Sequence, residues 1–358
     1  MSRPVDPAVI WLSMRIVAVT HAIPSRQLSN EDVVRLFREK NASRYSPETL
    51  ATLEKRICTY LTAAGTTTRH CLADNETPID FAVRAGLEAL NAAGFTSDQV
   101  EFLIYAGVAR GWIEPSTASA VQASLGLRRA TGFDVGDACA GWLRAMELAQ
   151  ALLRSGDYRC GLIINAECGL YRNYFQAELE SPNNLDRQLA GYTLGEAATA
   201  TLITNEEPPS KIYFRFRNLP EHHRLCMVPL PNAADFLSTA MESPITPYRF
   251  FAESGELLRT ATRVLIEEFR RDECLQGESY DIAFGHSASE KVERIIADRL
   301  GLAAVYRSIH PLYGNTGSAS IPLAMSLALE EGRLRRGHRV LAVVASAGIS
   351  VGFGSFIF

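Results

Sequence analysis

Hydrophobic positions along the chain follow two patterns that alternate. Short runs rich in aliphatic and β-branched residues predict buried strands, and these are Met14–Thr20, Val100–Ala106, Tyr158–Ala166, Leu194–Ile203, Tyr280–Phe284 and Val340–Ser346. Longer runs with apolar residues at helical spacing, several ended by glycine, predict helices, and these are Glu31–Lys40, Ile79–Ala93, Thr117–Leu125, Gly141–Arg154, Leu257–Arg270, Ser289–Leu300 and Ile321–Glu331. Alternating strands and helices predict an α/β protein in which helices cover the sheets.

The same order of elements occurs twice. Leu125-Gly126 corresponds to Leu300-Gly301, and the segment 154–166 corresponds to 335–347, so the copies are offset by roughly 175–181 positions. Between the copies, Lys211–Arg217 alternates like an exposed strand and Glu221–Pro247 is irregular and rich in proline. The chain is therefore predicted to be an internal duplication, with halves 1–205 and 206–358. Their seam is the predicted place for an active site.

Three residues expected at this seam have side chains that could act together in one reaction. Cys139 lies in GFDVGDACAGW, between a strand-like run and a helix, where a helix N-terminus favours thiolate over thiol. Asn315 lies in the corresponding second-half loop, and His286 follows a second-half strand. Together they suit attack of a thiolate on an acyl carbonyl and hydrogen bonding to an enolate-like oxygen. Each has a plainer alternative: an inert buried cysteine, a structural histidine and an ordinary turn asparagine.

Composition narrows the function further. The formal net charge of −4 gives no basic excess for nucleic acid, and no apolar run is long enough to span a membrane. Seven cysteines without a CxxC pair argue against a disulfide framework or a zinc site and favour a reducing, cytoplasmic setting. P-loop and dinucleotide fingerprints are absent from the sequence. No metal and no permanently bound cofactor are predicted.

Several motifs at these separations resemble one family. GFDVGDACAGW, FGHSAS and YGNTGSAS, with TTTRHCLADNET at 66–77 and EPSTASAVQASLGL at 114–127, resemble β-ketoacyl synthase III of the thiolase-fold superfamily. The resemblance extends from about residue 14 to residue 358. It implies a duplicated thiolase-like fold with five layers, α-β-α-β-α.

The resemblance also implies roles. Cys139 would accept an acyl group, and His286 and Asn315 would stabilise the enolate formed when a malonyl thioester loses carbon dioxide. The oxyanion hole would use backbone N–H groups of Cys139 and of Ala347 or Gly348. Substrates would arrive on phosphopantetheine, carried by acyl carrier protein or coenzyme A, and the protein would be a homodimer in fatty acid or polyketide biosynthesis.

The sequence departs from the family pattern at several places. The usual His-Gln-Ala-Asn is His-Ser-Ala-Ser at 286–289, and a glycine triplet becomes Ser-Ala-Gly at 346–348. Thr59 and Ala63 stand where bacterial members use tryptophan and arginine to hold coenzyme A, which favours an acyl group on a carrier protein. Glu114 stands where the family has an apolar residue that reaches across the dimer into the partner's acyl tunnel.

Glu114 therefore leads to a specific expectation. A carboxylate near an acyl tunnel is costly unless solvated or paired, which suggests a polar, short or cationic acyl group or a reshaped tunnel. The alternative is that Glu114 faces solvent.

Two other functions stay open. The changed residues after His286 allow a non-decarboxylating acyltransferase that moves the Cys-bound acyl group to a hydroxyl or amine. A non-catalytic partner subunit is disfavoured because such subunits usually lose the nucleophile.

Overall fold

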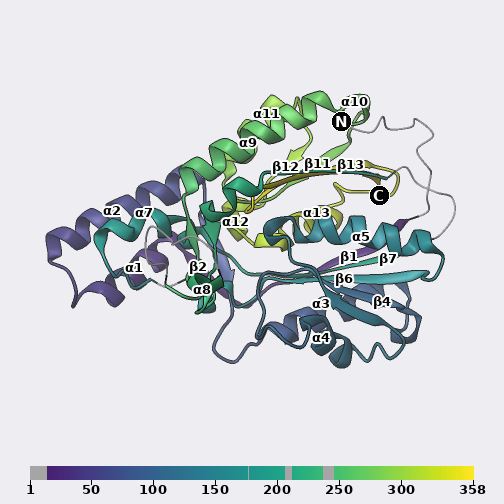
Figure 1. The fold of residues 1–358 in the computed structure, drawn as a ribbon, viewed down its shortest axis with the longest axis horizontal. Helices are drawn as coiled ribbons and strands as arrows, with labels where there is room; N and C mark the ends of the chain where they lie inside the picture. Colours follow the sequence, from purple (N-terminus) through teal and green to yellow (C-terminus); the bar gives the residue numbers. More distant parts are fainter. Residues whose placement is uncertain (1–13, 176, 206–211, 237–245) are drawn as a thin grey trace.

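Two five-stranded sheets organise the computed structural model, which describes residues 14–175, 177–205, 212–236 and 246–358 (Figure 1). The first sheet has the order β1-β7-β6-β4-β5, with strands β1 (Arg15–Ala22), β4 (Phe102–Tyr105), β5 (Thr131–Asp134), β6 (Cys160–Ala166) and β7 (Ala198–Thr204). The second has the order β12-β11-β13-β14-β8, with strands β8 (Tyr213–Asn218), β11 (Ile282–Gly285), β12 (Tyr306–Arg307), β13 (Arg339–Ser346) and β14 (Ser350–Ile357).

The two sheets have the same topology. In each, three neighbouring strands run parallel (β5, β4 and β6; β12, β11 and β13), and the next two strands pair antiparallel. Each strand of the first sheet thus has a counterpart in the second, in the same chain order. The predicted boundary at 205/206 borders residues 206–211, which lie outside the described residues, so the division into halves at that point stays a prediction.

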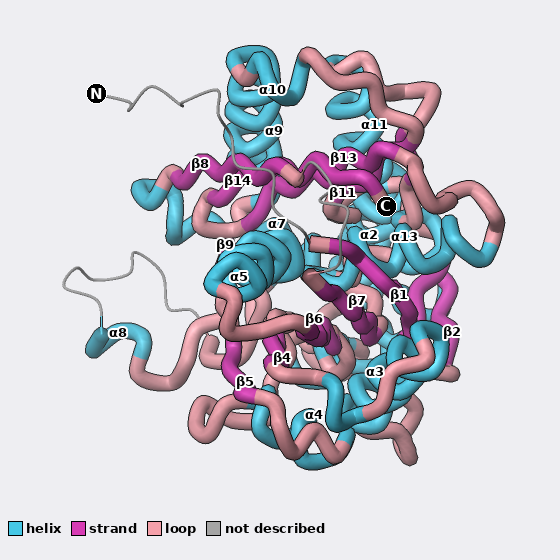
Figure 2. Tube along the Cα trace, turned by 90° about the vertical axis from the view of Figure 1, so that its right-hand side faces the viewer, coloured by secondary structure: helices cyan, strands magenta, loops and turns pink. Residues whose placement is uncertain are grey.

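Helices fill the space between the sheets and cover both outer faces (Figures 1 and 2). The central helices are α5 (Gly141–Ser155) and α13 (Ser320–Glu330). The first sheet is covered by α3 (Pro78–Ala93) and α4 (Thr117–Leu125), and the second by α9 (Ser254–Arg271), α10 (Glu273–Gln276) and α11 (Glu290–Arg299). The predicted α/β fold with five layers, α-β-α-β-α, is confirmed.

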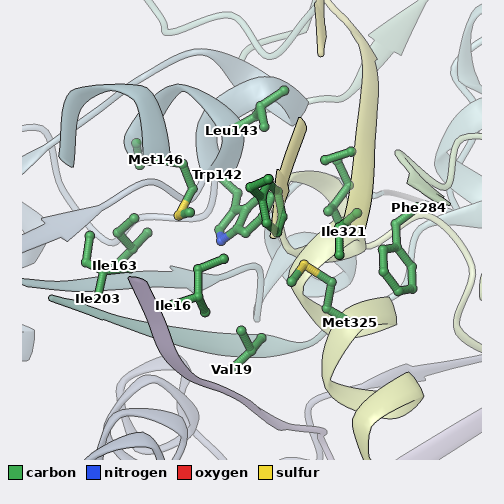
Figure 3. Packing of buried hydrophobic residues seen from close by; sticks show 14 of the residues in the cluster. Ile16, Val19, Trp142, Leu143, Met146, Ile163, Ile203, Phe284, Ile321 and Met325 are labelled. Carbon is green, nitrogen blue, oxygen red and sulfur yellow. The ribbon is translucent and has the colours of Figure 1, made fainter. Parts of the chain in front are cut away.

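The central helices hold the two halves together through a buried apolar core. Trp142 and Met146 of α5 face Ile321 and Met325 of α13 between the sheets (Figure 3). The indole N–H of Trp142 donates to Thr201 Oγ1 at 3.0 Å, so this large ring is buried without an unsatisfied donor. Replacing a buried tryptophan by alanine costs about 3–5 kcal/mol. The two short turns that lead into these helices, described below, therefore rest on a well-packed buried layer.

A smaller group of elements lies beside the sheets. It contains α1 (Asn30–Asn41), α2 (Pro47–Ala64), the hairpin of β2 (Arg26–Ser29) and β3 (Thr68–Cys71), α6 (Leu170–Asn173), α7 (Leu185–Gln188), α8 (Ala233–Phe236), α12 (His310–Tyr313), β9 (Cys226–Met227) and β10 (Phe251–Ala252). Short 3₁₀ turns lie at Ser97–Gln99, Pro182–Asn184, Leu189–Thr193 and Pro220–Leu225. Within the described ranges, no helix is long and apolar enough to cross a membrane.

The sequence analysis missed β14, because its glycines at 352 and 354 resemble turn residues. Both pair with strand β8, opposite Phe216 and Phe214. A Cβ at Gly352 would collide with the Phe216 ring, and one at Gly354 would collide with the Leu143 side chain and crowd the Phe214 ring, so the glycines make room for large side chains packed on the strand. The irregular segment predicted at 221–247 contains only short elements where it is described, and residues 237–245 lie outside the description.

Candidate active site

The site is built by two short helical turns, each running into a central helix. The first, η2 (Ala138–Ala140), runs into α5, and the second, η6 (Gly317–Ala319), runs into α13. The two turns contact each other, and their first residues are 179 positions apart, as are the first residues of α5 and α13. The repeat offset therefore holds at the seam, where the sequence predicted an active site.

Cys139 occupies the middle of η2, at the N-terminal end of α5. Ala138 has a left-handed backbone, with φ of 44°, and this sharp bend precedes the cysteine. Burial raises the pKa of the Cys139 thiol well above its usual range, and nearby Cys226 and Glu167 raise it further, while a hydrogen bond with the Ser346 side chain opposes them. The resting group is a thiol, so it must lose its proton as it attacks.

His286 directly follows β11. Its backbone N–H donates to Val343 O at 3.0 Å, and its Nδ1 lies 3.3 Å from Ser320 Oγ. Burial, and to a smaller extent the nearby His310, lower the pKa of the imidazole to about 4, against a hydrogen bond with the backbone of Gly317 that raises it. At neutral pH the ring is uncharged. It can therefore hold a proton on one nitrogen and accept one on the other.

Asn315 is fixed by backbone hydrogen bonds on both sides. Its N–H donates to Thr193 O at 2.8 Å, and its carbonyl accepts from Gly195 N–H at 2.9 Å. Its side-chain Oδ1 accepts from Gly317 N–H at 3.0 Å. Gly314 must be glycine, because its φ is 65° and a Cβ there would collide with Thr193 O. The Gly317 contact occupies Oδ1, so the function of the side chain falls to its amide N–H donors.

One cavity of about 490 Å³ has Cys139, His286 and Asn315 in its wall. The structure thus brings together the three residues that the sequence singled out. Ala347 also lines the cavity, whereas Gly348 is not among the lining residues. Their predicted roles, including the oxyanion hole, stay predictions.

Glu114 does not line this cavity within the single chain. It is exposed, while Trp112 and Ile113 of the same loop form part of the wall. Its predicted place was in the tunnel of a dimer partner, so that prediction stays open.

Sequence reasoning missed Glu167, a fully buried carboxylate beside the site. Its oxygens accept from the backbone N–H groups of Val108 and Ala109 at 3.0–3.1 Å and from both the N–H (3.0 Å) and the hydroxyl (2.5 Å) of Ser318. It joins the loop after β4 to the turn that follows Asn315. The available signal was an acidic residue directly after the strand 160–166, in which Asn165 is the one strongly polar residue.

Within the described ranges, no three His, Cys, Asp or Glu side chains are grouped so that they could hold a metal ion. The prediction of no permanently bound cofactor stays a prediction.

Family models and related sequences that match this chain describe the same kind of synthase. Family models described as 3-oxoacyl-[acyl-carrier-protein] synthase III match residues 133–217, and its C-terminal model matches 271–356. A β-ketoacyl-[acyl-carrier-protein] synthase III of Symbiobacterium thermophilum is 30% identical over 346 residues, covering 94% of this chain and 97% of that protein. One of Clostridium perfringens is 30% identical over 299 residues, covering 79% and 86%.

Solved structures show the same fold. Xanthomonas campestris OleA, as a variant with bound lauric acid and lauroyl-CoA, has a TM-score of 0.81 at 20% identity, covering 98% of this chain and all of that one. The 3-oxoacyl-[acyl-carrier-protein] synthase III of Aquifex aeolicus has a TM-score of 0.78 at 23% identity, covering 96% and 100%. The fold is that of the thiolase superfamily.

Proposed function

The chain belongs to the β-ketoacyl-[acyl-carrier-protein] synthase III family, and from this premise we propose that it is an acyl-transferring condensing enzyme. The observation that carries the proposal is that Cys139, His286 and Asn315 line one cavity at the junction of two helix-initiating turns. A thiol, a neutral imidazole and a carboxamide are the groups needed for acyl transfer followed by decarboxylation.

The first step is transfer of an acyl group to Cys139. The sulfur attacks the carbonyl carbon of an acyl thioester, and backbone N–H groups at Cys139 and Ala347 stabilise the oxyanion. The carbon–sulfur bond to the carrier then breaks, and the carrier thiolate takes up the proton that Cys139 loses. The N-terminal end of α5 favours the transient Cys139 thiolate.

The second step is decarboxylation and carbon–carbon bond formation. A malonyl-type thioester loses carbon dioxide, and the resulting enolate oxygen accepts hydrogen bonds from His286 and the Asn315 amide. The enolate carbon attacks the acyl carbonyl on Cys139. The bond between the acyl carbon and the Cys139 sulfur breaks, the thiolate takes up a proton from solvent water, and a β-ketoacyl thioester departs.

The substrates fit phosphopantetheine carriers, either acyl carrier protein or coenzyme A. Thr59 and Ala63 replace the coenzyme A contacts of bacterial members, and this supports a carrier protein as the acyl donor. A homodimer, a substrate tunnel that includes Glu114 of the partner, and a place in fatty acid or polyketide biosynthesis belong to the same proposal.

Release of labelled carbon dioxide tests the reaction. Wild-type protein given an acyl thioester and carboxyl-labelled malonyl thioester should release the label and form a β-ketoacyl thioester, and Cys139→Ala should form none. Condensation by Cys139→Ala at the wild-type rate would disprove the proposal. Acyl transfer to an alcohol or amine without label release would instead favour the non-decarboxylating acyltransferase.

A further inference from the structure

A buried carboxyl group in the cavity wall has no part in the chemistry above. Glu293 of α11 is 2% exposed and lines the same cavity as Cys139. Its surroundings there are mostly apolar, with Leu258, Ala261 and Leu265 of α9 and Ile296 of α11 in the same wall. A wall for a plain alkyl chain does not need a carboxyl group, and burying one without a partner is costly.

The partners of Glu293 are all hydroxyl groups. Oε1 accepts from Ser287 Oγ at 3.2 Å and from the Tyr306 hydroxyl at 3.4 Å, and Oε2 accepts from Ser308 Oγ. Among the described residues, no Lys, Arg or His forms an ion pair with it. Ser287 belongs to the His-Ser-Ala-Ser segment, so the departure from the family pattern after His286 supplies one of these partners.

The cluster and the reacting groups share one cavity wall. Ser287 directly follows His286, and the Tyr306 hydroxyl fills the space where a Cβ of Gly285 would lie. Tyr306 also lines the cavity. A substrate group in this cavity can therefore reach both the imidazole that the reaction uses and the Glu293 cluster.

One hydrogen-bonding position remains in the cluster. A carboxyl group offers about four hydrogen-bonding positions, one of them an O–H donor when the group is protonated, and the three hydroxyl partners occupy three of the four. Burial raises the pKa of Glu293 to about 8, against the lowering by its hydroxyl partners, so the group is largely uncharged at neutral pH. An uncharged carboxyl both donates and accepts hydrogen bonds, and a hydroxyl group is its natural complement.

We propose that Glu293 is a specificity-determining residue that selects an acyl group carrying a hydroxyl group. This inference rests on the proposed condensing function and names its substrate class. The hydroxyl of the acyl chain takes the open hydrogen-bonding position of the Glu293 carboxyl, while the methylenes pack against the apolar wall of α9 and α11.

The test compares thioesters matched in length. Hexanoyl, ω-hydroxyhexanoyl and ω-aminohexanoyl groups, with butanoyl and octanoyl counterparts, are offered to the full-length protein as thioesters of acyl carrier protein and of coenzyme A. Acylation of Cys139 is followed by intact-protein mass, and binding is measured by calorimetry on Cys139→Ala. Wild type should prefer the hydroxyacyl group of the best length by about tenfold or more, because an unpaired buried polar group opposes the plain chain.

Three variants separate recognition from structure. Glu293→Leu should lose the hydroxyl preference while retaining or improving the plain acyl group. Glu293→Gln should keep most of it, because the amide also donates and accepts. Glu273→Gln, at an exposed carboxyl on α10, serves as the matched control and should behave as wild type.

The remaining outcomes would each contradict either this inference or the proposed function. Equal losses for both acyl groups in Glu293→Leu would make Glu293 merely structural, and a preference for the aminoacyl group would make the substrate class wrong. If wild type accepts all acyl groups equally, the proposed function stands and this inference falls. If no thioester of either carrier acylates Cys139 but Cys139→Ala binds hydroxyacyl thioesters preferentially, the proposed function falls, and only the selection of a hydroxyl group by Glu293 stands.

Discussion

The two turns of the candidate site, η2 and η6, occupy equivalent positions in the two halves, but their central side chains have different environments. The counterpart of Cys139 in the second half is Ser318, 179 positions later, like the other residues of the turns. Cys139 lines the cavity, whereas Ser318 is buried, with its hydroxyl donating to Glu167 and accepting from Asn165 Nδ2 at 2.9 Å. Duplication supplied two equivalent turns, and only one keeps a reactive group free.

The side chains that hold the two turns in place, called their anchors below, also differ between the halves. Glu167, after β6, holds the second-half turn, and its counterpart Ser346, 179 positions later, holds the first-half turn. Ser346 Oγ accepts from Ala140 N–H and donates to Asp137 O, both at 3.3 Å. A buried carboxyl group that accepts from three backbone N–H groups at 3.0–3.1 Å and from one hydroxyl at 2.5 Å fixes a turn more firmly than one hydroxyl with two longer hydrogen bonds. The turn that presents Asn315 is thus the more rigid of the two.

The largest effect should follow removal of the stronger anchor. Glu167→Ala should lower the free energy of unfolding by about 3–5 kcal/mol, because three backbone N–H groups and one hydroxyl lose a buried acceptor. Urea denaturation measures the loss. Glu167→Gln keeps one acceptor oxygen, so its free energy of unfolding should lie between those of the wild type and Glu167→Ala. A loss below about 1 kcal/mol in Glu167→Ala would show that the two anchors do not differ in strength.

The next largest effect should separate the two turns in function. Asn315→Ala should slow decarboxylation by about 10²–10³-fold, the usual cost of one oxyanion donor, and leave acylation of Cys139 near the wild-type rate. Label release and intact-protein mass measure the two steps. Equal slowing of both would contradict the division of labour between the turns.

The free energy of unfolding should depend on pH partly through His286. The corresponding first-half position holds Ala106, which does not titrate. The pKa of His286 is about 4 in the folded protein and about 6.5 in the reference state. The unfolded chain therefore binds more protons between these values, and stability falls as pH drops from about 6.5 to about 4. In His286→Asn this fall should be smaller by roughly 1–3 kcal/mol, although His310 still contributes. Urea denaturation at pH 7 and pH 5 checks it, and identical falls in both proteins would contradict it.

The smallest effect should come from the weaker anchor. Ser346→Ala should lower the free energy of unfolding by at most about 1 kcal/mol, the net value of an ordinary hydrogen bond. The same denaturation series measures it beside Glu167→Ala. If Ser346→Ala proved as costly as Glu167→Ala, the contrast between the anchors would be wrong.

Much of the fold was predictable because it depends on local patterns. Apolar periodicity gave most helices and strands, and the offset of the repeat predicted that the Cys139 and Asn315 turns meet. Strand β14 was missed because the side chains that require its glycines come from β8 and α5, more than a hundred positions earlier. Such a pairing leaves no signal within the strand itself.

The site was predictable only where the chemistry lies in short motifs. Cys139, His286 and Asn315 each lie in a short motif next to a predicted strand or helix. Glu167 and Glu293 act through partners from separate parts of the chain, such as Val108 and Ser308. Their sequence surroundings resemble a strand end and an ordinary charged helix, so only the folded structure shows that they are buried.

The central claim is that Cys139 carries the acyl group while Asn315 serves the later decarboxylation. It is tested most directly by peptide mapping of Asn315→Ala after incubation with an acyl thioester and a malonyl thioester. The acyl group should accumulate on Cys139, while wild type under the same conditions turns it over to β-ketoacyl product. An acyl group on another cysteine, or no acylated protein, would contradict the claim.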